Sequence, residues 1–228
     1  RVETDQRDSV WALDAPFDGE PVEIARFEDR YYGVTFTSEG QFGMAVEYDR
    51  DTREVRNWLV DFAPGGADPR LFEERSIQNS YADPGSPLTI RNGFGQSVAA
   101  VIDGAMYFTG DGASPDGDRP FLNRVDFNTF ETTELWRNAG ENYEEVIDIL
   151  SDDGARFLTS YEDPETPPNV YLREGDGMRA ITAKAVTANA TTVSISCCST
   201  ATRACVPSCF RVSSAASAPH SVLRRPER

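Results

Sequence analysis

The sequence TGDGASPDGDRPFL, residues Thr109–Leu122, is too rich in glycine and proline to form a regular strand or helix. Glycine supplies backbone angles that are closed to other residues, and proline lacks a backbone N–H donor. On either side, Ser97–Phe108 and Phe121–Trp136 each read as a strand, a tight turn and a second strand, with Asp103-Gly104 as the first turn. A second irregular segment, Phe72–Pro87, lies upstream. The pattern predicts a scaffold of hairpins that presents elaborate loops.

The size and composition of the chain indicate a globular protein. It has 228 residues, of which 39% are hydrophobic and 11% aromatic, and this content argues against global disorder. No apolar run is long enough to span a membrane, and no signal-peptide pattern opens the sequence. We therefore expect a soluble protein with no membrane partner. The compartment stays open between the cytoplasm and a bacterial periplasm.

The charge is distributed unevenly along the chain. Arg1–Thr182 contains 16 Arg, no Lys and 37 Asp or Glu, a net charge of 16 − 37 = −21. Ala183–Arg228 contains six Lys or Arg and one Glu, a net charge of 6 − 1 = +5. The acidic body argues against a nucleic-acid partner, because phosphates need cations to neutralise them. The acidity is typical of proteins adapted to high salt, and an ordinary acidic surface encoded by a GC-rich gene is the alternative.

Strand patterns dominate the body of the chain. Short runs with β-branched or aromatic residues are separated by turn residues. These runs are Ser9–Leu13, Val22–Ala25, Tyr31–Thr37, Phe42–Tyr48, Glu54–Val60, Ser97–Ile102, Ala105–Thr109, Phe121–Val125, Thr132–Trp136, Arg156–Ser160 and Asn169–Leu172. One segment, Asn142–Leu150, fits either a helix or a strand. The sequence therefore predicts an all-β fold.

A weak internal repeat indicates the architecture. Asp49–Thr52 leads on to Trp58, and Asp126–Thr129 leads on to Trp136. A unit of about 40 residues built from short antiparallel strands is typical of a β-propeller blade. We therefore predict a partial β-propeller of four-stranded antiparallel blades over Arg1–Thr182, with about four to five blades and the tryptophans filling the space between them. A β-sandwich is the alternative.

The last 46 residues, Ala183–Arg228, follow a different pattern. They are rich in Ala, Ser, Thr, Arg and Pro and contain all four cysteines and the one histidine, His220. With little apolar surface to bury, this low-complexity segment is expected to be a disordered tail. Its composition also resembles an out-of-frame translation of a GC-rich gene.

Several motifs of the body resemble those of one enzyme family. Asp8–Phe17, Glu28–Gly33 and Arg53–Trp58 resemble successive blade segments of bacterial and plastid glutamyl endopeptidases, which are serine peptidases of the prolyl oligopeptidase class. The resemblance is sharpest in the two irregular segments, RSIQNSYADPGSP at Arg75–Pro87 and GDGASPDGDRPFL at Gly110–Leu122. Their motif residues are Tyr81, Asp83, Gly112, Pro120 and Phe121.

The resemblance covers about Asp8–Thr182 and carries its own implications. In that family a β-propeller is followed by an α/β-hydrolase domain with a Ser-Asp-His triad, and the propeller limits which peptides reach it. The chain then resembles the substrate-gating part of a peptidase that hydrolyses peptide bonds after Glu, with the peptide substrate engaged through a catalytic domain that is missing here. The alternative is a stand-alone propeller that binds a protein partner without catalysis. Unpaired blade edges would also allow edge-mediated self-association.

No catalytic residue is predicted within this chain. The body has no G-x-S-x-G nucleophile elbow and no histidine to accept a serine proton, so enzymatic activity of the chain itself stays uncertain. The cysteine spacing does not fit a zinc site, and Asp111, Asp116 and Asp118 lack the full pattern of a calcium loop. We expect no metal and no cofactor.

Arg75 is the one candidate for substrate contact. A peptidase that cuts after glutamate needs a cation to meet the acidic side chain, and arginine does so with two parallel hydrogen bonds. The alternative is that Arg75 pairs with Asp83 or Glu74 and braces its own loop.

Overall fold

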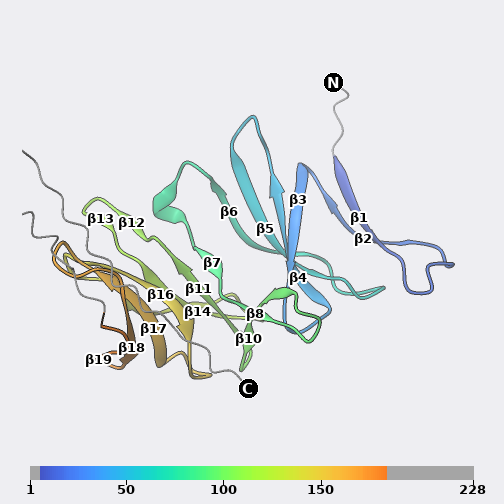
Figure 1. The fold of residues 1–228 in the computed structure, drawn as a ribbon. Coiled ribbons are helices and arrows are strands. Elements are labelled where there is room, and N and C mark those ends of the chain that lie inside the picture. Colours follow the sequence, from blue (N-terminus) through green and yellow to red (C-terminus); the bar gives the residue numbers. More distant parts are fainter. Residues whose placement is uncertain (1–5, 184–228) are drawn as a thin grey trace, which may run out of the picture. The chain divides into compact units, whose positions relative to one another are not determined.

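The computed structural model describes residues 6–183, which lie within one compact unit (Figure 1). The tail, with its cysteines and His220, lies outside the described residues apart from Ala183, and its predicted disorder stays a prediction. The predicted all-β class is confirmed, since the described elements are strands and one three-residue 3-10 helix, η1 (Ser80–Ala82).

Three antiparallel sheets, each with four strands paired in the order of the chain, form most of the fold. The first contains β3 (Arg30–Phe36), β4 (Phe42–Tyr48), β5 (Glu54–Asp61) and β6 (Arg70–Ser76). The second contains β10 (Val101–Ile102), β11 (Ala105–Gly110), β14 (Phe121–Asp126) and β15 (Thr132–Arg137), with β7 (Ser86–Pro87) also paired to β11. The third contains β16 (Tyr143–Ile149), β17 (Arg156–Glu162), β18 (Asn169–Glu174) and β19 (Gly177–Ala180). Up-and-down sheets of four strands that follow one another along the chain are the blades of a β-propeller.

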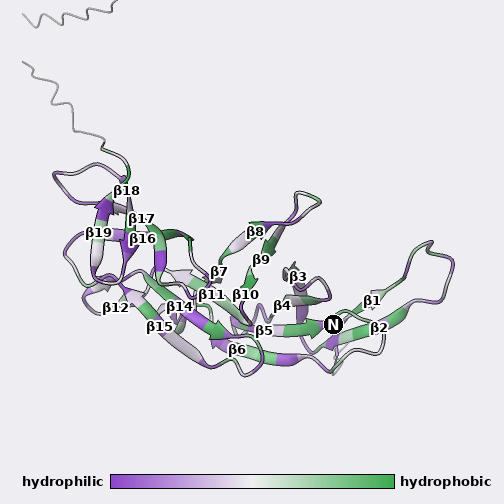
Figure 2. Cartoon of the chain, turned by 90° about the horizontal axis from the view of Figure 1, so that it is seen from below, coloured by the Kyte–Doolittle hydropathy of each residue, from purple (hydrophilic) through white to green (hydrophobic). Residues whose placement is uncertain are grey.

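Three two-stranded ladders complete the described fold. They are β1 (Asp8–Ala12) with β2 (Val22–Phe27), β8 (Thr89–Arg91) with β9 (Ser97–Ala99), and β12 (Ala113–Ser114) with β13 (Gly117–Asp118). The predicted number of blades stays a prediction. Hydrophobic and hydrophilic residues are interspersed along the strands (Figure 2).

Two segments differ from the sequence-based expectation. Asn142–Leu150, which fitted a helix or a strand, forms β16. Phe72–Pro87 was expected to be irregular throughout, but its first five residues belong to β6. Charged residues obscure the apolar–polar alternation of β6. Phe72 stacks on Phe108 of the next sheet, with ring centroids 5.1 Å apart, while the carboxylate of Glu74 pairs with Arg56 within its own sheet.

The Asp103-Gly104 turn is confirmed as the link between β10 and β11. Asp103 and Gly104 have φ angles of 47° and 67°, and Ile102 pairs directly with Ala105. Two consecutive positive φ angles are the signature of a type I′ turn, whose twist matches that of the strands it joins.

The internal repeat marks a kind of turn and not the blade period. In Asp49–Arg53, the backbone N–H of Arg53 donates to the carbonyl of Asp49 at 2.9 Å, and Phe130 bonds in the same way to Asp126. Arg53 and Phe130 both have positive φ angles, of 67° and 62°. The first turn joins the second and third strands of its sheet, whereas the second joins the third and fourth. The spacing of the two motifs therefore does not measure one blade.

Three apolar clusters join neighbouring sheets. The first contains Met44 and Leu59 from one sheet and Met106, Phe108 and Val125 from the next, together with Phe127. The second contains Ala25, Phe27, Ala45 and Val60, and the third contains Tyr107, Leu122 and Phe157. Each cluster takes residues from two sheets, so the packing between sheets forms the core.

The tryptophans were expected to lie between blades, and this is wrong for one of them. Trp136 packs on Phe157 of the next sheet, with ring centroids 5.8 Å apart, and Trp58 packs against the second cluster. Trp11 is 53% exposed. It lies at an irregularity of the β1–β2 ladder, and its indole N–H donates to the hydroxyl of Ser9 at 2.8 Å.

Candidate functional site

The two irregular loops that carry the family resemblance lie against each other. Ser86 and Pro87 of the first loop form β7, which pairs with Thr109 and Phe108 of β11, the strand that leads into the second loop. At this contact Gly85 has a φ of +81°, and a Cβ atom on it would lie 2.2 Å from the carbonyl oxygen of Thr109. A side chain at Gly85 would therefore push the two loops apart.

A pocket of about 410 Å³ lies between these two loops. It is lined by Ser80, Asp83, Gly85, Ser86, Thr109, Gly110, Asp111, Gly112, Ala113 and Asp118. We call it the two-loop pocket. Of the predicted motif residues, Asp83 and Gly112 line this pocket, while Tyr81 lies in η1 and is 68% exposed.

The second loop is a small hairpin, which corrects the expectation that it contains no regular strand. β12 and β13 pair with each other, and the N–H of Arg119 donates to the carbonyl of Gly112 at 3.0 Å. The hydroxyl of Ser114 donates to the carbonyl of Gly117 at 2.6 Å. Gly112 has a φ of +63°, and a Cβ atom there would lie 2.0 Å from the carbonyl oxygen of Arg119. Gly112 is therefore needed to close the hairpin.

Pro120 and Phe121 form the buried base of the second loop. Pro120 is fully buried, and its carbonyl accepts a 2.8 Å hydrogen bond from the N–H of Asn138. Phe121 is 3% exposed, and the guanidinium of Arg137 lies 5.1 Å from the centre of its ring. These two motif residues hold the loop in place and do not line the pocket.

Arg75 lies in the arrangement that the bracing alternative describes. Its guanidinium forms a salt bridge with Asp83 at 2.9 Å and lies 3.5 Å from a carboxylate oxygen of Glu73, and its side chain is only 15% exposed. Glu74, the other suggested partner, pairs with Arg56 at 2.7 Å. Arg75 thus ties β6 to the first loop. Its contact with a substrate stays a prediction.

Burial disfavours the charged form of the Glu73 carboxylate, which lies next to Arg75. Removal of its carboxylate from water raises the pKa of Glu73, and the opposing effects of Arg75 and Asn57 are smaller. The amide of Asn57 donates to one carboxylate oxygen at 2.5 Å. The other oxygen faces the Nε of Arg75 at 3.5 Å, without a hydrogen bond. The Glu73 carboxylate beside Arg75 is therefore poorly stabilised as an anion.

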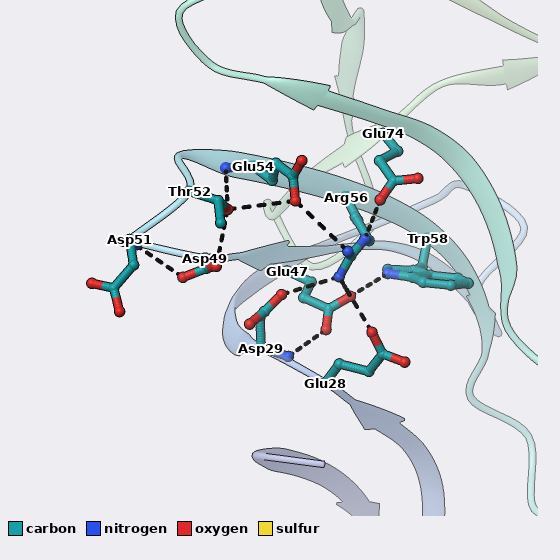
Figure 3. A network of polar contacts seen from close by, with 10 residues as sticks. All are labelled: Glu28, Asp29, Glu47, Asp49, Asp51, Thr52, Glu54, Arg56, Trp58 and Glu74. Carbon is teal, nitrogen blue, oxygen red and sulfur yellow. Dashed lines mark hydrogen bonds and ion pairs between the residues drawn. The ribbon is translucent and has the colours of Figure 1, made fainter. Parts of the chain in front are cut away.

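A second polar site, missed by the sequence analysis, is centred on Arg56 of β5 (Figure 3). Its side chain is 18% exposed and lies among five carboxylates. The distances are 2.7 Å to Glu74, 3.0 Å to Asp29, 3.6 Å to Glu28, and 3.9 Å to both Glu47 and Glu54. The strand register brings three of these residues into one row, because Arg56 pairs with Glu47 on one side and Glu74 on the other.

Glu47 anchors the buried side of this network. Its side chain is 2% exposed, and its oxygens accept hydrogen bonds from the N–H of Asp29 at 2.6 Å and the indole N–H of Trp58 at 2.9 Å. Burial raises the pKa of the Asp29 carboxyl, and the nearby carboxylates of Asp49 and Glu47 add to the effect. A pocket of about 420 Å³ adjoins the network, but the charged side chains that line it are paired: Glu28, Glu47 and Glu74 with Arg56, and Arg26 with Glu23 outside the pocket. We interpret this site as structural.

A buried ion pair occupies the third sheet. Arg173 of β18 donates to both carboxylate oxygens of Glu144 on β16, at 2.8 and 2.5 Å, and the hydroxyl of Thr159 donates to the same carboxylate at 2.6 Å. The Glu144 side chain is 1% exposed. The guanidinium also lies 5.8 Å from the ring centre of Trp136, so the pair links two sheets.

The described residues contain no Ser–His pair. Residues 6–183 contain no histidine, so neither Ser80 nor Ser86 in the two-loop pocket has an imidazole base within this part of the chain. Across the same range, no group of three or more His, Cys, Asp or Glu side chains is placed to hold a metal ion. None of the helices that the structure describes is long and apolar enough to cross a membrane.

Sequence comparison confirms the resemblance to glutamyl endopeptidases. No family model matches the chain. A protein named probable glutamyl endopeptidase, chloroplastic, from Oryza sativa subsp. japonica is 32% identical over 188 residues, which cover 76% of this chain and 20% of the relative. A protein of the same name from Arabidopsis thaliana is 32% identical over 160 residues, covering 67% of this chain and 17% of the relative. The chain thus spans at most 20% of the length of these relatives.

The backbone was also compared with solved structures. TolB from Acinetobacter baumannii superposes with a TM-score of 0.38 and 15% sequence identity, over 77% of this chain and 38% of the TolB chain.

Proposed function

We propose that this chain is the propeller portion of a glutamyl-endopeptidase-like serine peptidase and limits which peptides reach a hydrolase domain. One observation carries the proposal. The two loops with the family resemblance pack against each other where Gly85 meets Thr109, and together they line one pocket. The sequence identity of 32% to two proteins named as such peptidases supports it. Peptide-bond hydrolysis after Glu is then assigned to the hydrolase domain and not to the described residues.

Rigid loops suit a gating role because selection of substrates by size requires a surface whose conformation does not change when the substrate binds. Arg75 ties the first loop to β6 through Asp83, and the buried Pro120 and Phe121 hold the second. A flexible loop would lose conformational entropy on contact with each peptide, whereas a preorganised one does not. The two loops therefore contribute shape and charge to substrate selection, without taking part in bond cleavage.

One observation favours the second candidate, a stand-alone module that binds a protein partner. Phe94, at the tip of the β8–β9 hairpin, is 91% exposed. The side-chain oxygen of Asn92 accepts hydrogen bonds from the N–H groups of Phe94 and Gln96, both at 3.0 Å, so the tip is ordered. An aromatic side chain presented on an ordered turn is typical of an interface anchor.

A hybrid enzyme tests the proposal. Residues 8–182 of this chain replace the aligned segment of the rice relative, and cleavage of short Glu-containing peptides is compared with cleavage of a folded protein. We expect the hybrid to cleave the peptides and spare the folded protein. The same hybrid with Gly85→Ala and Gly112→Ala should lose this discrimination, because the first substitution separates the two loops and the second opens the hairpin of the second loop.

The controls separate the two candidates. The intact 228-residue chain, tested alone, is expected to cleave none of the peptides and to resist labelling by a serine-directed fluorophosphonate. A hybrid that is folded by circular dichroism but inactive would favour the stand-alone binding module. A folded, active hybrid that cleaves both substrates alike would exclude gating.

A further inference from the structure

Two pockets of opposite character are lined by residues of the segment 77–86. Ile77 lines a pocket of about 320 Å³ together with Tyr32, Val46, Tyr48 and Val55, which we call the apolar pocket. Three residues further on, Ser80 lines the two-loop pocket. Since a chain extends by at most about 3.6 Å per residue, the Cα atoms of Ile77 and Ser80 are within about 11 Å of each other. The two pockets are therefore neighbours.

The apolar pocket presents apolar groups to solvent. Tyr32 is 77% exposed and Ile77 is 45% exposed. The rings of Tyr32 and Tyr48 meet edge to face at 6.3 Å, and Arg53 donates to the hydroxyl of Tyr48 at 3.2 Å. Small-molecule sites have volumes of about 300–1,000 Å³, so this pocket lies at the small end of that range and suits one large apolar side chain.

The two-loop pocket carries excess negative charge. Asp83, Asp111 and Asp118 line it, and Arg75 neutralises Asp83 at 2.9 Å. Among residues 6–183, no arginine or lysine forms a salt bridge with either Asp111 or Asp118. A positively charged group that entered this pocket would meet the two carboxylates of Asp111 and Asp118, which no cation of the described residues neutralises.

We propose that these neighbouring pockets form one docking surface for a peptide that carries a large apolar side chain and a Lys or Arg. The apolar side chain occupies the apolar pocket, and the cation lies against Asp111 and Asp118. An extended peptide rises about 3.3 Å per residue, so three of its residues can span at least the distance between Ile77 and Ser80, whose upper bound is about 11 Å. The inference rests on the proposed function only in taking a peptide as the class of ligand.

Charge favours this occupant over a second copy of the chain. The segment 1–182 carries 16 Arg and 37 Asp or Glu, a net charge of −21, so two copies repel each other. A basic peptide is attracted to the same surface. The attraction should also raise the association rate at low ionic strength.

Fluorescence anisotropy with the intact 228-residue chain tests the inference. The probe is a labelled peptide with a phenylalanine and a lysine separated by two glycines. Two matched peptides replace the lysine by glutamate or the phenylalanine by alanine. We expect the peptide with both phenylalanine and lysine to bind at least about tenfold more tightly than either matched peptide. One matched peptide lacks the cation for the two-loop pocket, and the other lacks the apolar side chain for the apolar pocket.

Two pairs of variants assign the binding to the two pockets. Asp111→Asn with Asp118→Asn should weaken binding of the lysine peptide about three- to tenfold, whereas Asp68→Asn with Asp176→Asn, which removes equal charge elsewhere, should not. Tyr32→Ser should weaken binding, whereas Phe94→Ser, at another exposed aromatic residue, should not. All four side chains of the charge variants are on exposed residues, so folding should be retained.

The inference is overturned if no peptide binds, if the glutamate peptide binds as well as the lysine peptide, or if the Asp111 and Asp118 variant binds like the unsubstituted chain. These results are independent of the hybrid enzyme. An active, discriminating hybrid combined with equal binding of all three peptides would remove this docking surface and leave the proposed function in place. An inactive hybrid with selective binding would do the reverse.

Discussion

Gly85 lies so close to Thr109 that a Cβ atom on Gly85 would be 2.2 Å from the Thr109 carbonyl oxygen. The same glycine has a φ of +81°, in the region that L-amino acids with side chains rarely adopt. Both restrictions act at the point where β7 pairs with β11. The two loops can therefore meet only if this residue is glycine.

Gly85→Ala is expected to destabilise the protein by about 2–4 kcal/mol, since it adds backbone strain and separates β7 from β11. Urea unfolding followed by circular dichroism measures the change. Gly93→Ala is the matched control, because a Cβ atom at Gly93 meets nothing within 4 Å. Equal stability of the two variants would contradict the close contact.

Glu144→Gln is expected to cost about 2–4 kcal/mol, because it leaves the guanidinium of Arg173 without its carboxylate in a largely buried position. Glu144→Leu combined with Arg173→Met removes both charges and should recover most of the loss. A double-mutant cycle from urea unfolding gives the coupling energy. Additive effects of the two single substitutions would show that the pair does not act as a unit.

The pH dependence of stability should report the burial of Glu73. Its folded-state pKa is raised by burial above the ordinary value of 4.5, so ionisation is less favourable in the folded state than in the unfolded state. Below pH 4.5 the carboxyl is protonated in both states and contributes no pH dependence. As the pH rises from 4.5 through the raised folded value, ionisation progressively lowers the stability of the folded state.

Glu73→Gln cannot ionise and keeps an acceptor for Asn57. Its stability relative to the unsubstituted protein should therefore increase as the pH rises from 4 to 7, as measured by urea unfolding at a series of pH values. Glu141→Gln, at an exposed position, is the matched control. A difference that stays constant or shrinks over this range would contradict the predicted direction.

The strands that the sequence predicted best are those with regular alternation. Phe42–Tyr48 was predicted with the bounds that β4 has, because apolar residues on a paired, half-buried strand dominate the pattern. β6 was missed because Glu73, Glu74 and Arg75 interrupt that pattern, although all three find partners across the sheet or in the adjoining loop. A charged strand is recognisable only when its partners are known.

The candidate site was predictable in its parts but not in its assembly. Both loops were identified from glycine and proline content, yet their contact depends on the pairing of Ser86 with Thr109, a register that no local pattern specifies. The Arg56 network has the same origin, since Glu47, Arg56 and Glu74 meet only because three strands align. The repeated Asp-x-x-Thr motif misled in the opposite way, because similar turns occur between different strand pairs.

Added salt is expected to raise the melting temperature by several degrees between about 20 mM and 1 M NaCl. Segment 1–182 carries 16 − 37 = −21 charges, and the screening length falls from about 10 Å at 0.1 M to about 3 Å at 1 M, which suppresses their mutual repulsion. The pairs around Arg56 should lose less, because that side chain is only 18% exposed. Asp68→Arg with Asp176→Arg shifts the charge by +4 at exposed positions and should raise the low-salt melting temperature while flattening the salt dependence. Differential scanning calorimetry measures both proteins, and a melting temperature that falls with salt, or an unchanged slope in the variant, would refute self-repulsion as a determinant of stability.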